Sequence, residues 1–292
     1  MDGANMVESY MNGPTDEWLE QVNEEFSRND IPHRQRPWLA LLKWSEVAGV
    51  SASLGDEDEK NISDWFEKNT KAGSKYLGPM FIGSFFYDSC FWPVFIPVVG
   101  GTVQLDAAKS LRTMPDSIKS RLTRDSDAFM HYMALWTACV DYGFGIEELI
   151  ENKNISTFAQ ELLRSGDQQL SAAITLLHED RPNPKAVESA RMATEMFLKA
   201  FLAIKVGLTE KEAKDKVGHN LEKALDRCLA ADSQSELQAI RSSLNCFPEI
   251  GDRYKGAEKT SMELWQGYGV AQFTGATLVR SFTARDVRKN FR

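Results

Sequence analysis

The sequence predicts a mainly α-helical protein, with an α-rich N-terminal region followed by an antiparallel helical bundle. Two observations support this class: apolar residues recur at helical spacing through most of the chain, and residues typical of helix starts and stops flank these runs. The polar run Asn152, Lys153 and Asn154 is typical of a boundary. We therefore expect an N-terminal region over residues 1–151 and a helical bundle over residues 152–292.

The N-terminal region begins with periodic apolar runs after about a dozen residues that show no periodicity. An acidic stretch containing Ser and Gly, residues 51–60, separates the second run from the third. Three helices are therefore expected, over residues 16–26, 37–47 and 62–66.

A short aromatic insert follows at residues 76–105, where Phe, Val and Ile alternate with Gly and Pro. Such runs favour a small β or irregular insert. Asp88 interrupts the apolar run, and Pro93 and Pro97 would each remove a helical hydrogen bond. A membrane-spanning helix, which needs about 20 mostly apolar residues, is therefore not expected, and neither is a membrane partner.

Helical spacing then returns and continues toward the end of the sequence. A helix with an aromatic face is expected over residues 125–141, ended by Gly143 and Gly145, with one more helical turn at 146–150. The later helices are expected over residues 157–177, 184–205, 221–229 and 235–244, and within 256–282.

Residues 183–229 form the most informative stretch, an Ala-rich amphipathic helix joined by a short charged connector to a second helix. In the first helix Glu195 and Lys199 are four residues apart, in the favourable order of acid before base, and Gly207 is a natural stop. The second helix opens with Gly218-His219-Asn220-Leu221. The inward stripe of the first helix consists of Ala186, Ala190, Ala193, Phe197, Ala200, Phe201 and Ile204.

This pair of helices resembles the HEPN family (higher eukaryotes and prokaryotes nucleotide-binding domain). Its members often combine an Ala-rich helix carrying a Glu-x-x-x-Lys pattern with a Gly-His-x-Leu turn, read here at 195–199 and 218–221. The resemblance covers roughly residues 156–282. It implies an antiparallel helical bundle that binds a nucleotide, an RNA or a protein partner and forms a homodimer.

Four residues follow from the resemblance as candidate ligand contacts. Lys199 would offer its ammonium to a phosphate, although Glu195 would pair with it if both lie on a solvated face. His219 would contact a nucleotide, or would cap or orient the second helix. Arg253 and Tyr254 resemble an Arg-Tyr pair of family members that are not ribonucleases, and suit a phosphate and a base.

Many family members are metal-independent ribonucleases with an Arg-x(4–6)-His motif near the start of the last helix. Here no His follows Arg253 anywhere, so this motif is absent at the expected place. Arg124 and His131 match the spacing, and seven residues return to nearly the same helix face, but they precede the family-like helices. Arg28 and His33 also match, with Pro32 between them arguing against one continuous helix.

Composition narrows the possible partners. A formal net charge of -8 argues against broad electrostatic attraction to nucleic acid, although the Arg-rich stretch at residues 280–292 leaves room for a local basic patch. No Gly-rich phosphate loop, dinucleotide fingerprint or zinc spacing occurs, so no cofactor and no metal are expected. Without an N-terminal signal peptide, we expect a reducing cytoplasm, in which the scattered cysteines are buried thiols: Cys90, Cys139, Cys228 and Cys246.

The sequence therefore favours a non-catalytic, HEPN-like binding module. Two alternatives stay open: a metal-independent ribonuclease that uses Arg124 and His131, and a purely structural or toxin–antitoxin-like scaffold.

Overall fold

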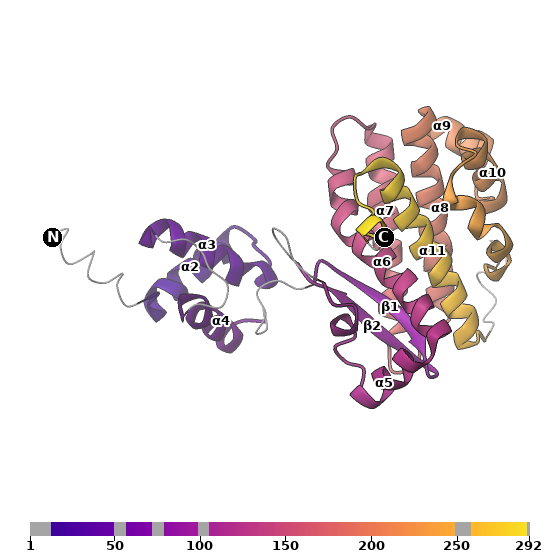
Figure 1. The fold of residues 1–292 in the computed structure, drawn as a ribbon. Helices are drawn as coiled ribbons and strands as arrows, with labels where there is room; N and C mark the ends of the chain where they lie inside the picture. Colours follow the sequence, from indigo (N-terminus) through magenta and orange to yellow (C-terminus); the bar gives the residue numbers. More distant parts are fainter. Residues whose placement is uncertain (1–12, 50–56, 72–78, 99–104, 249–257, 291–292) are drawn as a thin grey trace. The chain divides into compact units, whose positions relative to one another are not determined.

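Helices dominate the computed structural model, and the strands in the described residues form one small antiparallel sheet, which confirms the predicted mainly α class (Figure 1). The chain divides into two compact units, Met1–Pro79 and Met80–Arg292. The structure describes residues 13–49, 57–71, 79–98, 105–248 and 258–290.

Three helices of the first unit pack their apolar faces on one another. The Trp44 indole is buried among them and its Nε1 donates to Asp58 Oδ2 at 2.8 Å, so its polar edge is satisfied. The helices are α2 (Asp16–Arg28), α3 (Arg36–Ala48), preceded by the 3-10 turn η2 (His33–Gln35), and α4 (Glu57–Asn69). The buried residues are Leu19, Val22, Phe26, Ala40, Leu41, Trp44, Ile62 and Phe66.

The three predicted helices of this unit are confirmed, but α4 begins five residues earlier than expected. The end of the acidic stretch expected as a separator, residues 57–60, is helical, while residues 51–56 lie outside the described residues. Glu57, Asp58 and Glu59 occupy the first turn of α4, where negative charge interacts favourably with the helix dipole.

The aromatic insert, expected to be β or irregular, contains a β-hairpin of β1 (Phe81–Tyr87) and β2 (Cys90–Ile96). Its two turn residues, Asp88 and Ser89, have φ of 54° and 60°, the left-handed pair that a type I′ turn requires. One face of β1 packs along a helix of the second unit, α6 (Ser126–Ile150). Other parts of the expected insert, residues 76–78 and 99–104, lie outside the described residues.

Pro93 fits the hairpin because of its register. In a two-residue hairpin the closing pair, Tyr87 and Cys90, exchanges ladder hydrogen bonds, and bonded and non-bonded pairs then alternate. Pro93 is paired with Ser84 in a non-bonded position, so its missing N–H costs no ladder bond. The Ser84 N–H points away from the partner strand and donates to the Tyr268 hydroxyl at 2.9 Å.

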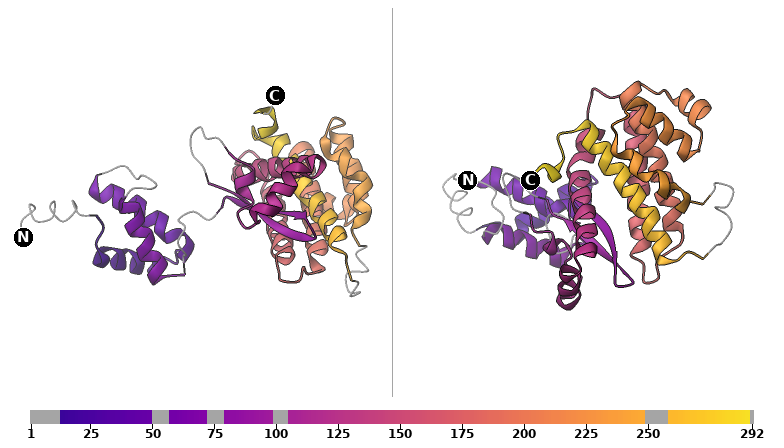
Figure 2. Two further views of the ribbon diagram at one scale, coloured as in Figure 1. Left: turned by 60° about the horizontal axis from the view of Figure 1, so that its bottom comes forward. Right: turned by 45° about the vertical axis from the view of Figure 1, so that its right-hand side comes forward.

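The remaining helices of the second unit form a bundle in which α8 is the central element, contacting α7, α10 and α11 (Figure 2). Phe197, Leu198 and Ala200 of α8 have no exposed surface. The other elements are η3 (Ala108–Ser110), α5 (Asp116–Arg124), α7 (Thr157–Leu177), α8 (Lys185–Val206), α9 (Glu210–Glu212), the π-helical turn η4 (Ala213–Val217), α10 (Leu221–Ala231), η5 (Glu236–Cys246), α11 (Ser261–Phe282) and η7 (Val287–Asn290).

Helix α6 corrects two predictions. It runs unbroken to Ile150, so Gly143 and Gly145 do not end it. A Cβ on Gly143 would lie 2.7 Å from the Phe81 Cβ, and one on Gly145 would lie 2.2 Å from Val279 Cγ1, so both glycines serve close packing. The expected boundary at residue 151 is also wrong, because α6 and the hairpin share one core with the later helices and the unit begins at Met80.

The later helices follow the predicted ranges closely. Helix α7 matches, and α8 ends as expected at Gly207, whose φ of 68° is left-handed. The run expected at 235–244 is helical but is the 3-10 element η5. No helix in the described part of the chain has both the length and the apolar run that crossing a membrane requires.

Candidate functional site

Two of the four predicted ligand residues come together at the junction of α8 and α10. Lys199 lies on α8, and His219 lies in the turn just before α10. Both side chains contact the same carboxylate, that of Glu195. Arg253 and Tyr254 lie outside the described residues.

Helix α8 supplies three charged side chains spaced four residues apart, Arg191, Glu195 and Lys199, so all three share one face. Glu195 is only 3% exposed, and its Oε1 accepts hydrogen bonds from Lys199 Nζ at 2.7 Å and from His219 Nδ1 at 2.9 Å. Arg191 Nη1 lies 3.5 Å from Glu195 Oε2. The alternative that places the Glu195–Lys199 pair on a solvated face is therefore wrong, since Lys199 is 9% exposed.

The turn before α10 positions His219. Gly218 has a φ of 63°, a conformation that favours glycine, and it ends η4. Asn220, and not His219, caps α10: its Oδ1 accepts from the Lys223 N–H at 2.8 Å. Arg191 Nη2 donates to the His219 carbonyl at 2.8 Å, so the turn is tied to α8 through both the backbone and the ring of His219.

His219 offers one free edge to the solvent. Its side chain is 70% exposed. Because an ionised carboxylate can only accept, the contact with Glu195 assigns the proton to Nδ1, which leaves Nε2 on the exposed side of the ring. This ring nitrogen can accept a hydrogen bond when His219 is neutral and can donate one when it is protonated.

The charges of the cluster do not balance. Arg191 and Lys199 each carry a positive charge, whereas Glu195 supplies the one carboxylate within ion-pair distance of them among the described residues. The cluster adjoins the N-terminus of α10, whose unpaired N–H groups add partial positive charge. Sequence reasoning missed Arg191, although it stands one turn before Glu195 on the same face.

The candidate ribonuclease pairs are not built into single helices. Arg124 is the last residue of α5, Asp125 caps α6, and His131 belongs to α6, so the expected shared helix face is wrong. Both side chains are exposed. In the other pair, Arg28 is the last residue of α2, and His33 lies five residues later, outside that helix. The His33 Nδ1 accepts a hydrogen bond from the Lys71 N–H at 3.1 Å.

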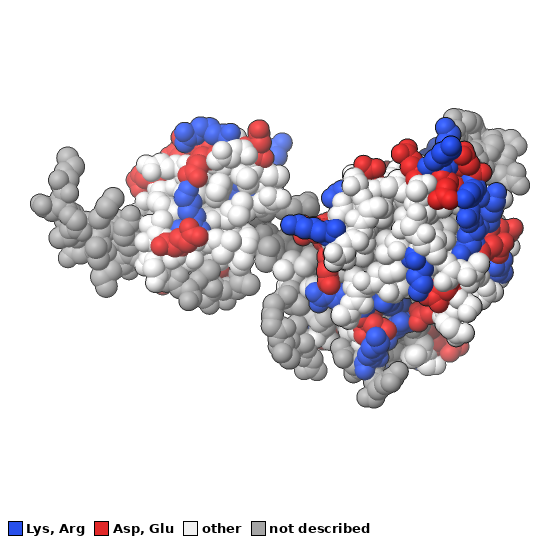
Figure 3. All heavy atoms as spheres, turned by 90° about the horizontal axis from the view of Figure 1, so that it is seen from above, with Lys and Arg blue, Asp and Glu red and all other residues white. Residues whose placement is uncertain are grey.

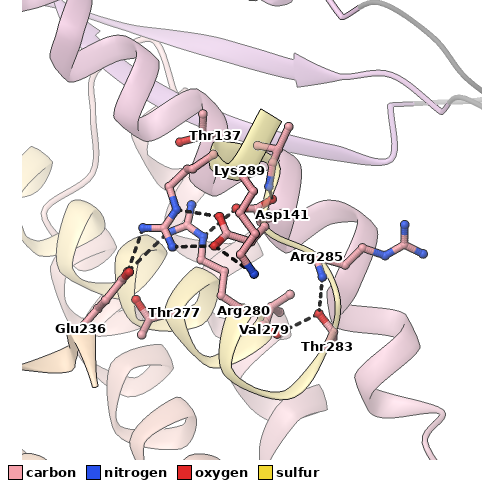
Figure 4. A network of polar contacts seen from close by, with 12 residues as sticks. Thr137, Asp141, Glu236, Thr277, Val279, Arg280, Thr283, Arg285 and Lys289 are labelled. Carbon is pink, nitrogen blue, oxygen red and sulfur yellow. Dashed lines mark hydrogen bonds and ion pairs between the residues drawn. The ribbon is translucent and has the colours of Figure 1, made fainter. Parts of the chain in front are cut away.

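A second polar network lies where α6, α11 and η5 meet (Figure 4). Asp141 is buried; its Oδ2 accepts from Arg280 Nε at 2.6 Å and its Oδ1 from the Val287 N–H at 2.7 Å. Burial raises the pKa of Asp141, and these hydrogen bonds oppose that rise. Two buried polar atoms here, Arg280 Nη2 and Thr277 Oγ1, have no hydrogen-bond partner among the described residues.

The cysteines offer no reactive thiolate in the core. Burial raises the pKa of Cys139 and of Cys228 to about 12, so both stay protonated near neutral pH. The prediction of buried thiols holds for these two, whereas Cys246 is partly exposed and Cys90, on the hairpin, is exposed. In the described ranges no cluster of three His, Cys, Asp or Glu side chains could hold a metal ion.

Net charge is divided unevenly between the units. The first unit has 15 acidic and 8 basic residues, a balance of -7, and the second has 27 and 26, a balance of -1. On the face of the second unit drawn in Figure 3, Lys and Arg side chains alternate with Asp and Glu side chains.

No model of a protein family, no curated protein and no solved structure matches the chain.

Proposed function

We propose that the second unit is a non-catalytic binding module that holds the phosphate of a nucleotide at the junction of α8 and α10. The observation that carries this proposal is the uncompensated charge of the cluster. Arg191 and Lys199 face a single carboxylate beside an exposed His219. An anion placed there would gain from both cations and from the start of α10.

The roles within this proposal differ by exposure. His219 makes the direct contact, because its Nε2 edge is open to solvent. Lys199 and Arg191 are both engaged in hydrogen bonds within the cluster, so they act through their charge. Charge acts more strongly at such a site than on an open surface, because buried pairs are screened less by salt.

The mixed charge of the second unit favours a small phosphate ligand over a long RNA at this site, since RNA binding depends on many neutralised phosphates. The ribonuclease alternative loses support because Arg124 and His131 lie on two helices. The HEPN resemblance adds a homodimer to the proposal, and the expected cytoplasmic location is kept as part of it. The scaffold alternative predicts no ligand at all.

Isothermal titration calorimetry of the full chain with ATP, AMP and inorganic phosphate tests the proposal. His219→Ala should weaken nucleotide binding about tenfold or more, since a hydrogen bond to a charged group contributes roughly 1.5–3 kcal/mol. His131→Ala is the matched control, an exposed histidine away from the cluster, and should leave the affinity unchanged.

Two outcomes would contradict the proposal: no heat with either nucleotide, or an equal effect of both histidine substitutions. Incubation with a labelled RNA separates the ribonuclease alternative. Cleavage that disappears in His131→Ala would establish that alternative in place of the binding module.

A further inference from the structure

The segment that follows α11 is basic and lies against the bundle. We call residues 283–290 the basic strap; it contains Arg285, Arg288 and Lys289, with Asp286 as its one acidic residue. Its last four residues form η7, which contacts α6. The strap is part of the Arg-rich stretch that the nucleotide site does not use.

A carboxylate pairs with each cation of the basic strap. Figure 4 shows the part of this network that includes Glu236 and Lys289. Arg285 Nε donates to Glu148 Oε2 of α6 at 2.8 Å. Arg288 Nη1 donates to Glu236 Oε2 of η5 at 2.9 Å, and its other nitrogens hold Asp286. Lys289 Nζ lies 3.7 Å from Asp286 Oδ2.

The contacts of the strap with Glu148 and Glu236 are individually weak, whereas Asp286, which is only 13% exposed, holds Arg288 with two hydrogen bonds. Arg285 and Glu148 are 50% and 47% exposed, and Arg288 and Glu236 are 37% and 46% exposed. Ion pairs in such positions contribute about 0–1 kcal/mol each and are screened by salt. Arg285 and the Nη1 edge of Arg288 are therefore available to a competitor that presents a higher density of negative charge.

The attachment of the strap is stronger near Asp141. That carboxylate is buried with Arg280 and also accepts from the Val287 N–H at 2.7 Å. Val287 is the only large apolar residue of the strap, and it packs partly against the core. Arg285, Arg288 and Lys289 can thus exchange partners while Val287 and Asp141 hold the strap's backbone.

We propose that the basic strap is a masked binding arm for a single-stranded nucleic acid, whose phosphates compete with Glu148 and Glu236 for Arg285 and Arg288. A phosphodiester backbone offers closely spaced negative charges that match cations three and four residues apart. The strap has no aromatic residue for base stacking, so recognition is of the backbone and not of sequence. A membrane surface is the poorer fit, because the one large apolar residue of the strap, Val287, packs against the core.

Fluorescence anisotropy with a labelled oligouridylate, measured from 50 to 200 mM KCl, tests the masking. The double variant Glu148→Gln with Glu236→Gln should bind at least fivefold more tightly than the native chain. The matched control is Asp116→Asn with Asp226→Asn, which changes net charge equally by removing exposed, ion-paired carboxylates of α5 and α10. The control should stay within twofold of the native affinity.

The arm itself is tested by replacing Arg285, Arg288 and Lys289 together by Ala. Because each single-strand phosphate contact contributes about 0.7 to the slope of log K against log salt, the slope should fall by about 2. His219→Ala should leave this binding unchanged, which separates it from the nucleotide site.

Two results would overturn the inference. Equal tightening in the unmasked and control variants would mean that only net charge matters. Binding to phosphatidylserine vesicles without binding to oligouridylate would mean that the partner is a membrane surface. An oligodeoxyuridylate should bind as tightly as the RNA, because the strap reads phosphates.

Discussion

Glu195 organises the candidate site. Its buried carboxylate accepts from Lys199 of the same helix and from His219 of the following turn, so one side chain joins α8 to the start of α10. Removing a charge from water is costly, and the cost is offset here by two direct hydrogen bonds and by Arg191 nearby. The same residue therefore positions His219 and stabilises the fold.

Replacing Glu195 by Gln should destabilise the second unit by about 3 kcal/mol or more, because Lys199 would remain as an unpaired buried cation. Glu212→Gln is the control: Glu212 also pairs with a Lys four residues on, but this pair is exposed, and Gln still suits its capping box. Urea denaturation followed by circular dichroism measures both changes. Equal, small losses would show that Glu195 has no special role.

At this scale the sequence was a partial guide to the site. The spacing of Glu195 and Lys199 fixes their pairing because helix geometry is local, and this prediction stands. The contact of Glu195 with His219 spans 24 positions, and that of Asp141 with Arg280 spans 139. No local pattern announces such contacts, so the Asp141 network and the pairing of the strap needed the tertiary structure.

Among the elements, α6 shows why glycine was misread. The sequence alone does not distinguish a glycine that ends a helix from a glycine that allows another element to pack closely against the helix. Gly143 lies where α6 packs closely against Phe81 of β1, and Gly145 lies where α6 packs closely against Val279 of α11. The starts of helices were predicted more reliably: α6, α7 and α10 begin within one residue of the expected positions, where Asp125, Ser156 and Asn220 accept capping hydrogen bonds.

Two glycine substitutions separate helix propensity from packing. Ala is favoured over Gly inside a helix by about 1 kcal/mol. A Cβ on Gly269 of α11 would meet no atom of another described element within 4 Å, so Gly269→Ala should stabilise by about that amount. Gly143→Ala should instead destabilise by about 1–3 kcal/mol, because its methyl would overlap Phe81. Thermal melts compare the two, and stabilisation by both would contradict close packing at Gly143.

For the whole molecule, the division at Pro79 replaces the one expected at residue 151. The polar run after α6 suggested a boundary, but it is only a turn between α6 and α7, both of which belong to the larger core. The division at Pro79 instead follows residues 72–78, which the sequence interpretation did not single out as a linker. The class of fold was predictable from periodicity, whereas the grouping of helices was not.

Separate cores predict separate responses to mutation. Trp44→Ala should destabilise the first unit by about 3–5 kcal/mol, the usual cost of truncating a large buried side chain. Hydrogen exchange followed by mass spectrometry should show lost protection in α2, α3 and α4, while α8 keeps its protection. Loss of protection in both units would show that they unfold together.

The register of Pro93 also affects whether copies of this chain aggregate through their strand edges at high concentration. A two-stranded sheet has two open edges, and each could extend into an intermolecular sheet. Pro93 removes the outward donor at the middle of β2, and the outward Ser84 N–H at the middle of β1 is already given to Tyr268. The hairpin thus resists recruitment of further strands, which protects an aromatic, aggregation-prone segment from polymerising.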